Sequence, residues 1–155
     1  MKNLINCLLL LTSLLLLTAC TKDVTRTGDT IELDDYKIHF GSFGGLCGYS
    51  DSLSIKSNLD LYYEQRSICR DQQIVKKDIL TAEQLTTLLA EVDLDKFASI
   101  ELNSCDRCFD GLDTYINIES DDFQHRIQYG ATDDIKSIRG LVEELSNLRE
   151  IYRED

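Results

Sequence analysis

Proline and tryptophan are absent from this 155-residue sequence, and only two histidines occur, His39 and His125. Repeats and low-complexity runs are also absent after the first 20 residues, which argues against repeat architectures and proline-rich linkers. His39 falls on the polar side of an alternating segment, whereas His125 shares the parity of apolar neighbours, as a half-buried, hydrogen-bonded histidine does. Because a nucleophile elbow and a phosphate-binding glycine loop are missing as well, we predict a protein without catalytic activity and without a cofactor.

Positive charge is scarce, with 16 Lys and Arg against 28 Asp and Glu, for a net charge of −12. Nucleic acid and anionic membrane surfaces repel such a domain, so we expect no nucleic-acid partner. Asp106, Asp110 and Asp113 form one acidic cluster whose oxygens suit calcium. Their spacing is not that of an EF-hand, however, and a solvated acidic loop is the favoured interpretation.

The N-terminus has the order of an export signal. Lys2 precedes an apolar stretch from Leu4 to Leu17, which is shorter than the ~20 residues that a membrane-spanning helix needs. The stretch ends in Leu17-Thr18-Ala19-Cys20, which resembles the lipobox of bacterial lipoproteins: an aliphatic residue, two small residues and a cysteine. The resemblance implies cleavage after Ala19 and attachment of acyl chains, such as palmitate, at Cys20.

The polar residues that follow Cys20 are typical of a flexible tether. We therefore divide the chain into a cleaved signal peptide (residues 1–19), a lipidated N-terminus with a flexible tether (20–29) and one globular domain (30–155). Thr21, a residue other than Asp after the lipidated cysteine, is consistent with sorting to the outer membrane. The predicted location is the bacterial cell envelope, anchored by lipid at the outer membrane, with the periplasmic and surface faces both open.

Alternation of apolar and polar residues predicts strands in the first half of the domain. Glycines at 41, 44, 45 and 48 predict a loop that holds Cys47. The short connections favour an antiparallel meander. Its four strands are expected around residues 36–40, 53–55, 59–66 and 74–79.

After residue 80, the spacing of the apolar residues changes from the alternation of a strand to that of a helix. Thr81 and Gln84 predict a capping box at the start of an amphipathic helix. Residues 115–119 and 123–129 predict a hairpin, and Asp133 is expected to cap a final helix in which Gly140 permits close approach to the sheet. The order ββββ-α-ββ-α predicts an α+β fold: an antiparallel sheet, made of a meander of about four strands plus a hairpin, with two helices packed on one face.

Four cysteines remain once the signal is removed and Cys20 is lipidated. In an exported chain, an even number favours disulfides. A meander places the loops with Cys47 and Cys69 at one end of the sheet, and the segment with Cys105 and Cys108 returns to the same end. We predict the pairs Cys47–Cys69 and Cys105–Cys108, with crossed pairing as the next alternative.

The same four cysteines also allow two functional interpretations, a zinc site and a redox pair. Four thiolates could form a structural zinc site, but Cys47 and Cys69 do not have the tight spacing of such ligands. The CxxC of Cys105 and Cys108 could be a redox pair, but a loop leading into a strand follows it rather than a helix. Both interpretations have less support from the sequence than two structural disulfides.

A segment near the domain's start resembles the opening of small bacterial domains of unknown function. Its residues are Cys47-Gly48-Tyr49-Ser50, followed by Leu53, Ile55, Asn58 and Tyr62. The likeness covers roughly residues 36–152 and implies a similar fold and location. Gly48 stands where that opening usually has proline.

These observations predict a membrane-anchored envelope lipoprotein with a non-enzymatic role in binding a protein, peptide or glycan. Phe43, Tyr49 and Phe109 are the expected contact aromatics, in loops at the cysteine-bearing end. The alternative is an envelope thiol-redox or metal-handling protein that uses Cys105 and Cys108.

Overall fold

A computed structural model describes residues 35–153 and confirms the α+β fold with the order ββββ-α-ββ-α. The first four strands form the predicted meander, and the last two form the predicted hairpin. The strands are β1 (Lys37–Gly44), β2 (Tyr49–Lys56), β3 (Asp60–Ser67), β4 (Gln72–Ile79), β5 (Leu112–Ser120) and β6 (Phe123–Tyr129).

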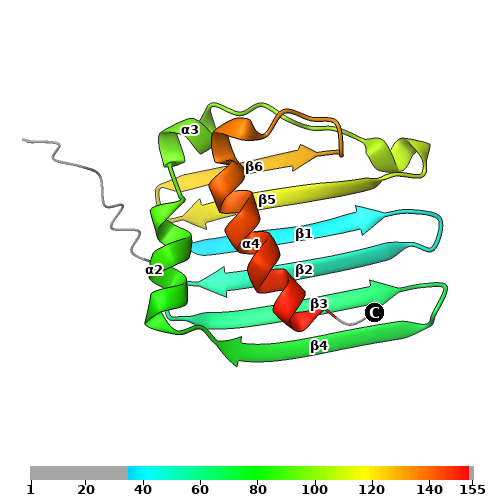
Figure 1. Cartoon of the computed structure of the whole chain (residues 1–155), viewed down its shortest axis with the longest axis horizontal. Helices are drawn as coiled ribbons and strands as arrows, with labels where there is room; N and C mark the ends of the chain where they lie inside the picture. Colours follow the sequence, from blue (N-terminus) through cyan, green and yellow to red (C-terminus); the bar gives the residue numbers. More distant parts are fainter. Residues whose placement is uncertain (1–34, 154–155) are drawn as a thin grey trace, which may run out of the picture. The chain divides into compact units, whose positions relative to one another are not determined.

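The six strands form one antiparallel sheet in the order β4-β3-β2-β1-β5-β6 (Figure 1). The hairpin of β5 and β6 therefore adds to the free edge of β1 rather than to β4. As a result β1 is hydrogen-bonded along its whole length on both sides, to β2 and to β5. The meander and the hairpin share one sheet because of this strand.

The helices cover one face of that sheet (Figure 1). The helical segments are α2 (Ala82–Ala90), α3 (Leu94–Ala98), α4 (Arg139–Tyr152) and the short 3-10 helices η1 (Asp106–Phe109) and η2 (Lys136–Ile138). Alternate strand residues point toward α2 and α4 and form the core, for example Ile38, Phe40, Leu53 and Tyr63. Among residues 35–153, no α-helix lies on the other face, where only the short η1 packs, against Phe43 and Asp113.

The start of α2 confirms the predicted capping box. The Thr81 side chain accepts a hydrogen bond from the Gln84 backbone, and the Gln84 side chain accepts one from the Thr81 backbone. The backbone N–H groups of Thr81 and Gln84, which would otherwise lack partners at the helix start, thereby both have hydrogen bonds.

The start of the last helix differs from the prediction. Asp133 does not cap it: α4 begins at Arg139 after η2, and its N-cap Ile138 makes no side-chain hydrogen bond. The Asp133 carboxylate instead accepts hydrogen bonds from the Gly130 N–H and the Ser104 hydroxyl. Gly140 lies against the side chain of Glu91 at the end of α2, so its small size serves contact between helices and not contact with the sheet.

The first strand is longer than predicted, because Gly41 and Gly44 belong to β1 and not to the following loop. Hydrogen bonds from both neighbouring strands hold this segment extended. A Cβ atom at Gly41 would meet the backbone oxygen of Asp51 and the Tyr115 hydroxyl. The absence of a side chain here lets Tyr115 lie across β1.

Within residues 35–153, the helices are all too short or too polar to cross a membrane.

We expect Gly41→Ala to lower the free energy of unfolding by about 1–3 kcal/mol, because the new methyl group meets backbone atoms that cannot move independently. Ser54→Ala, on the neighbouring strand and the same face, is the control and should change stability by less than about 0.5 kcal/mol. Urea unfolding of both variants measures the difference. Equal stability of the two variants would contradict the proposed close approach.

Candidate functional site

The four cysteines of the domain lie at one end of the sheet, which we call the disulfide end. It consists of the β1–β2 loop (residues 45–48), the β3–β4 loop (68–71) and η1. The predicted pairing is confirmed: Cys47 is bonded to Cys69, and Cys105 is bonded to Cys108. The first disulfide joins two neighbouring hairpin loops, and the second closes η1. Cys20, the predicted lipidation site, lies outside the described residues, as do the signal and the tether.

Asp113 holds η1 and its flanking residues against the sheet. Its side chain is fully buried and accepts hydrogen bonds from the backbone N–H of Asp106 (2.7 Å) and from the amide of Gln128 (3.2 Å). Arg107 approaches the same carboxylate at 3.5 Å. The Asp106 carboxylate in turn accepts from the N–H of Ala131. The interpretation of this segment as a solvated acidic loop is therefore wrong for Asp113, which acts as a structural anchor.

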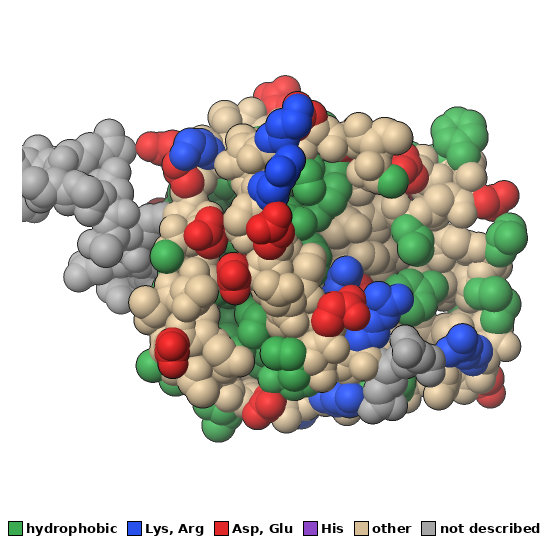
Figure 2. Space-filling view, in the orientation of Figure 1, with side chains coloured by type: hydrophobic (Ala, Val, Ile, Leu, Met, Phe, Trp, Pro, Cys, Tyr) green, Lys and Arg blue, Asp and Glu red, His purple; other side chains and the backbone are tan. Residues whose placement is uncertain are grey.

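Large apolar side chains are exposed at the disulfide end. Leu46, Ile68 and Phe109 are 86%, 72% and 89% exposed, and Leu112 is half exposed beside them. We call these four residues the tip. Figure 2 shows hydrophobic side chains along this edge of the molecule, where the β1–β2 loop and η1 lie.

Two of the three predicted contact aromatics lie elsewhere. Phe43 is in β1 on the sheet face without helices, where it packs against Tyr115. Tyr49 is the first residue of β2, points to the helix face and donates a hydrogen bond to Asp51. The prediction that both are loop aromatics is wrong because β1 and β2 extend further than expected. Phe109 alone of the three belongs to the tip.

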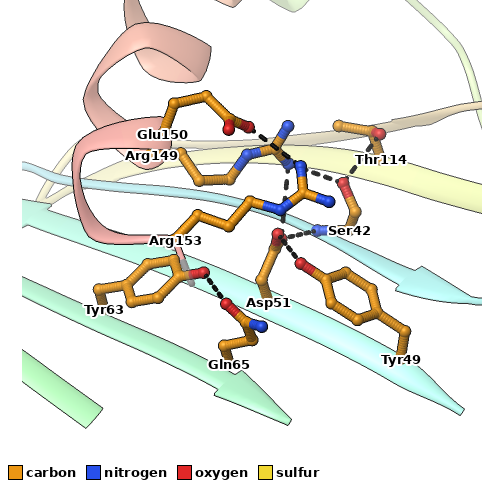
Figure 3. A network of polar contacts seen from close by, with 9 residues as sticks. All are labelled: Ser42, Tyr49, Asp51, Tyr63, Gln65, Thr114, Arg149, Glu150 and Arg153. Carbon is orange, nitrogen blue, oxygen red and sulfur yellow. Dashed lines mark hydrogen bonds and ion pairs between the residues drawn. The ribbon is translucent and has the colours of Figure 1, made fainter. Parts of the chain in front are cut away.

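A buried polar network lies on the helix face behind the disulfide end (Figure 3). Asp51 in β2 is its centre, with 2% of its side chain exposed. One carboxylate oxygen accepts from the Ser42 N–H at 2.8 Å, and the other accepts from the Tyr49 hydroxyl at 2.7 Å. The first bond ties β1 to β2 through a side-chain atom in addition to the sheet pairing, and the second lies within β2.

Arg149 connects this network to α4. Its Nη1 donates to the Ser42 hydroxyl at 2.9 Å and lies 3.4 Å from the Asp51 carboxylate. The guanidinium also lies over the ring of Phe40, 4.7 Å from its centre. Since Ser42 also bonds Thr114 of β5, the network joins one helix to three strands.

Burial raises the pKa of both tyrosines that flank Asp51. The pKa of Tyr63 rises to about 12, with the Asp51 charge as a further cause. Burial and the hydrogen bond to Asp51 raise the pKa of Tyr49 still further. Both hydroxyls therefore stay protonated even above the pH at which an ordinary tyrosine ionises, and Tyr63 donates to Gln65 as Tyr49 does to Asp51.

A hollow of about 330 Å³ opens between this network and the Cys47–Cys69 disulfide. Tyr49 and Gln65 contribute to its lining from the strands, and Arg70 and Arg153 contribute from the β3–β4 loop and the end of α4. Two guanidinium groups beside polar side chains favour an anionic or polar group as occupant.

The two histidines of the domain lie apart, each with its own partners. His125 bonds the carbonyl oxygen of Ile100 at 2.9 Å and packs edge-on to Phe97, which confirms its predicted half-buried position. His39 lies on the polar face near Glu119, and burial lowers its pKa. The structure described for residues 35–153 contains no group of three or more His, Cys, Asp or Glu side chains placed to hold a metal.

Sequence reasoning missed Asp51 and Arg149. The two residues are 98 positions apart, so no local motif links them. The available signal was an aspartate in the inward-facing series of β2, together with Arg149 on a helix face next to Leu148.

No family model matches the chain, and no curated protein matches it. The likeness to small bacterial domains of unknown function stays a prediction.

We expect Asp51→Ala to lower the free energy of unfolding by about 3–5 kcal/mol, because it leaves the largely buried Arg149 without its carboxylate. Asp78→Ala, which removes an exposed carboxylate bonded to Tyr152, should cost far less, because solvent screens an exposed pair. The double variant D51N/R149M should recover part of the loss, since no buried charge is left alone. Urea unfolding compares the variants, and equal losses for Asp51→Ala and Asp78→Ala would contradict this role.

Proposed function

We propose that this chain is a lipid-anchored envelope protein of bacteria that binds a protein partner through its tip and catalyses no reaction. The observation that carries the proposal is the exposure of Leu46, Ile68 and Phe109 in three segments at one end of the sheet. Soluble proteins rarely expose neighbouring large apolar side chains without an interaction that covers them.

The tip is held in shape before any partner arrives. Cys47–Cys69 joins the loops that carry Leu46 and Ile68, and the backbone N–H of Ile68 also donates to the Cys47 carbonyl. The Gly45 N–H donates to Gly111, which links the first loop to the residues just before β5. A surface fixed in this way loses little conformational entropy on binding, so more of its contact energy becomes affinity.

The position of the tip also suits an anchored protein. β1 runs from the point where the chain enters the domain toward the disulfide end, so the tip lies at the opposite end of the sheet from that entry (Figure 1). If lipid at Cys20 anchors the chain, the membrane is one partner and the tip is left for another.

The alternative, a thiol-redox or metal-handling protein using Cys105 and Cys108, has less support. The two sulfur atoms are bonded to each other, and Cys105 precedes a 3-10 helix of only four residues. Such a short helix adds little of the dipole that would lower the pKa of a redox thiol.

The anchor is tested by Cys20→Ser. We expect this variant to keep its signal uncleaved by the lipoprotein peptidase and to lose the acyl mass, because the thiol carries the first lipid. Intact-mass analysis of the two proteins from membranes measures both effects. Normal lipid labelling of Cys20→Ser would contradict the anchor.

The tip is tested with the triple variant L46S/I68S/F109S and a matched control. V75S/I79S/I151S removes three other exposed apolar side chains, from β4 and α4. A photo-crosslinking residue at position 112 in each background should yield one discrete protein adduct from cell envelopes. We expect the adduct to be lost in the tip variant and kept in the control. Equal adducts from both variants would contradict the tip as the docking surface.

A further inference from the structure

The sheet face without helices has the opposite charge to the protein as a whole. We call it the open face; it consists of the alternate strand residues that point away from α2 and α4, together with Arg107 of η1, which lies over Phe43. Four carboxylates from the strands share it: Asp60 is exposed, Glu64 and Glu119 are half-buried, and Asp113 is buried. Six cations lie on it: Lys37, Lys56, Arg66, Lys77, Arg107 and Arg126. In a protein with a net charge of −12, this face is therefore positive.

Two arginines on the open face are held in place by aromatic rings. The Arg126 guanidinium lies 4.2 Å from the ring centre of Tyr115, and the Arg107 guanidinium lies 4.6 Å from that of Phe43. The two rings pack against each other with 5.9 Å between their centres. Stacking fixes the plane of a guanidinium and leaves its outer N–H groups available to an oxyanion.

Three lysines and one carboxylate, Asp60, line a hollow of about 470 Å³ on the same face. Lys37 and Lys56 lie directly opposite each other on β1 and β2, and the ammonium of Lys77 lies 6.0 Å from the centre of the Tyr62 ring. Like charges in opposite positions of a sheet destabilise it. Glu119 lies 3.2 Å from Lys37 and offsets part of this repulsion. A bound anion would offset more of it.

The remaining side chains of the open face indicate what kind of anion fits. Hydroxyl and amide groups, such as Ser52, Ser54, Asn117 and Gln124, surround the cations. They can hydrogen-bond sugar hydroxyls. A protein interface needs an apolar centre, whereas the exposed apolar side chains of this face, Val75 and Ile79, lie on the edge strand β4. The faces of Tyr115 and Phe43 toward Arg126 and Arg107 are occupied, so they offer no stacking platform to nucleic-acid bases.

We propose that the open face binds an acidic polysaccharide, a chain of sugars that carry carboxylate groups. The lysine hollow lies toward the end of the sheet where β1 begins, and the stacked arginines lie over β1, β5 and β6. An extended polymer with repeated carboxylates reaches both places at once. This site is separate from the tip and does not depend on the tip's function.

The test is binding of alginate, a polyuronate, to the full chain in a neutral detergent. The face variant K56Q/K77Q/R126Q removes three cations from the open face. Its control, K76Q/K96Q/K136Q, removes the same charge elsewhere; Lys76 precedes Lys77 on β4 and points to the opposite face. We expect the face variant to bind alginate about tenfold more weakly or worse, and the control to change less than about twofold. Thermal unfolding of both variants confirms that the fold is kept.

Dextran, polyglutamate and single-stranded DNA are the comparison ligands. Stronger binding of alginate than of all three supports the proposal. If polyglutamate or DNA binds as tightly as alginate, or if the control loses as much affinity as the face variant, the proposal is overturned. Absence of alginate binding by the unchanged protein overturns it as well, and the crosslinking result at the tip is unaffected by any of these outcomes.

Discussion

The pairing of β1 with both β2 and β5 is the constraint on which the rest of the molecule depends. Without the contact of β1 and β5, the meander would be a four-stranded sheet and the hairpin an isolated two-stranded ribbon, which is marginally stable in water. With it, Ile38 and Phe40 lie at the centre of a six-stranded core. Ser42 on the same strand then meets partners from β2, β5 and α4. Both faces and both ends of the domain take their positions from this strand.

The sheet separates two kinds of surface by the parity of its residues. Neighbours in sequence, such as Lys76 and Lys77, contribute to opposite faces. The helix face can therefore be selected for packing while the open face is selected for its charge. The disulfide end forms a third surface, because loops are free of the alternation that governs the strands. This separation explains how a small domain can present an apolar tip and a basic face together.

The sequence allowed accurate prediction where the signal was local. Alternation identified the strands, and Thr81 with Gln84 identified the start of α2, because both patterns depend on residues a few positions apart. The up-and-down topology brings the cysteine loops to one end, which favoured the observed pairing and left crossed pairing open. The lipid anchor and the tether lie outside the described residues and stay predictions.

Prediction failed where distant residues compete for a side chain. Asp133 looks like a helix cap, yet Ser104 and Gly130 take its carboxylate. Asp113 looks like a surface acid, yet the backbone of Asp106 folds over it. The pairing of Asp51 with Arg149 has no local signal, since it exists only after α4 packs on the sheet. Each of these contacts is a product of tertiary structure.

The direction of β1 has a mechanical consequence. A force between the domain's entry at Tyr36 and a partner held at the tip acts nearly parallel to β1. The hydrogen bonds from β1 to β2 and β5 lie across that direction, so they bear the load together in shear instead of opening one after another. The two disulfides add covalent links where the load enters at the tip. A domain anchored at one end and bound at the other, as we propose, would therefore resist being pulled apart along that line.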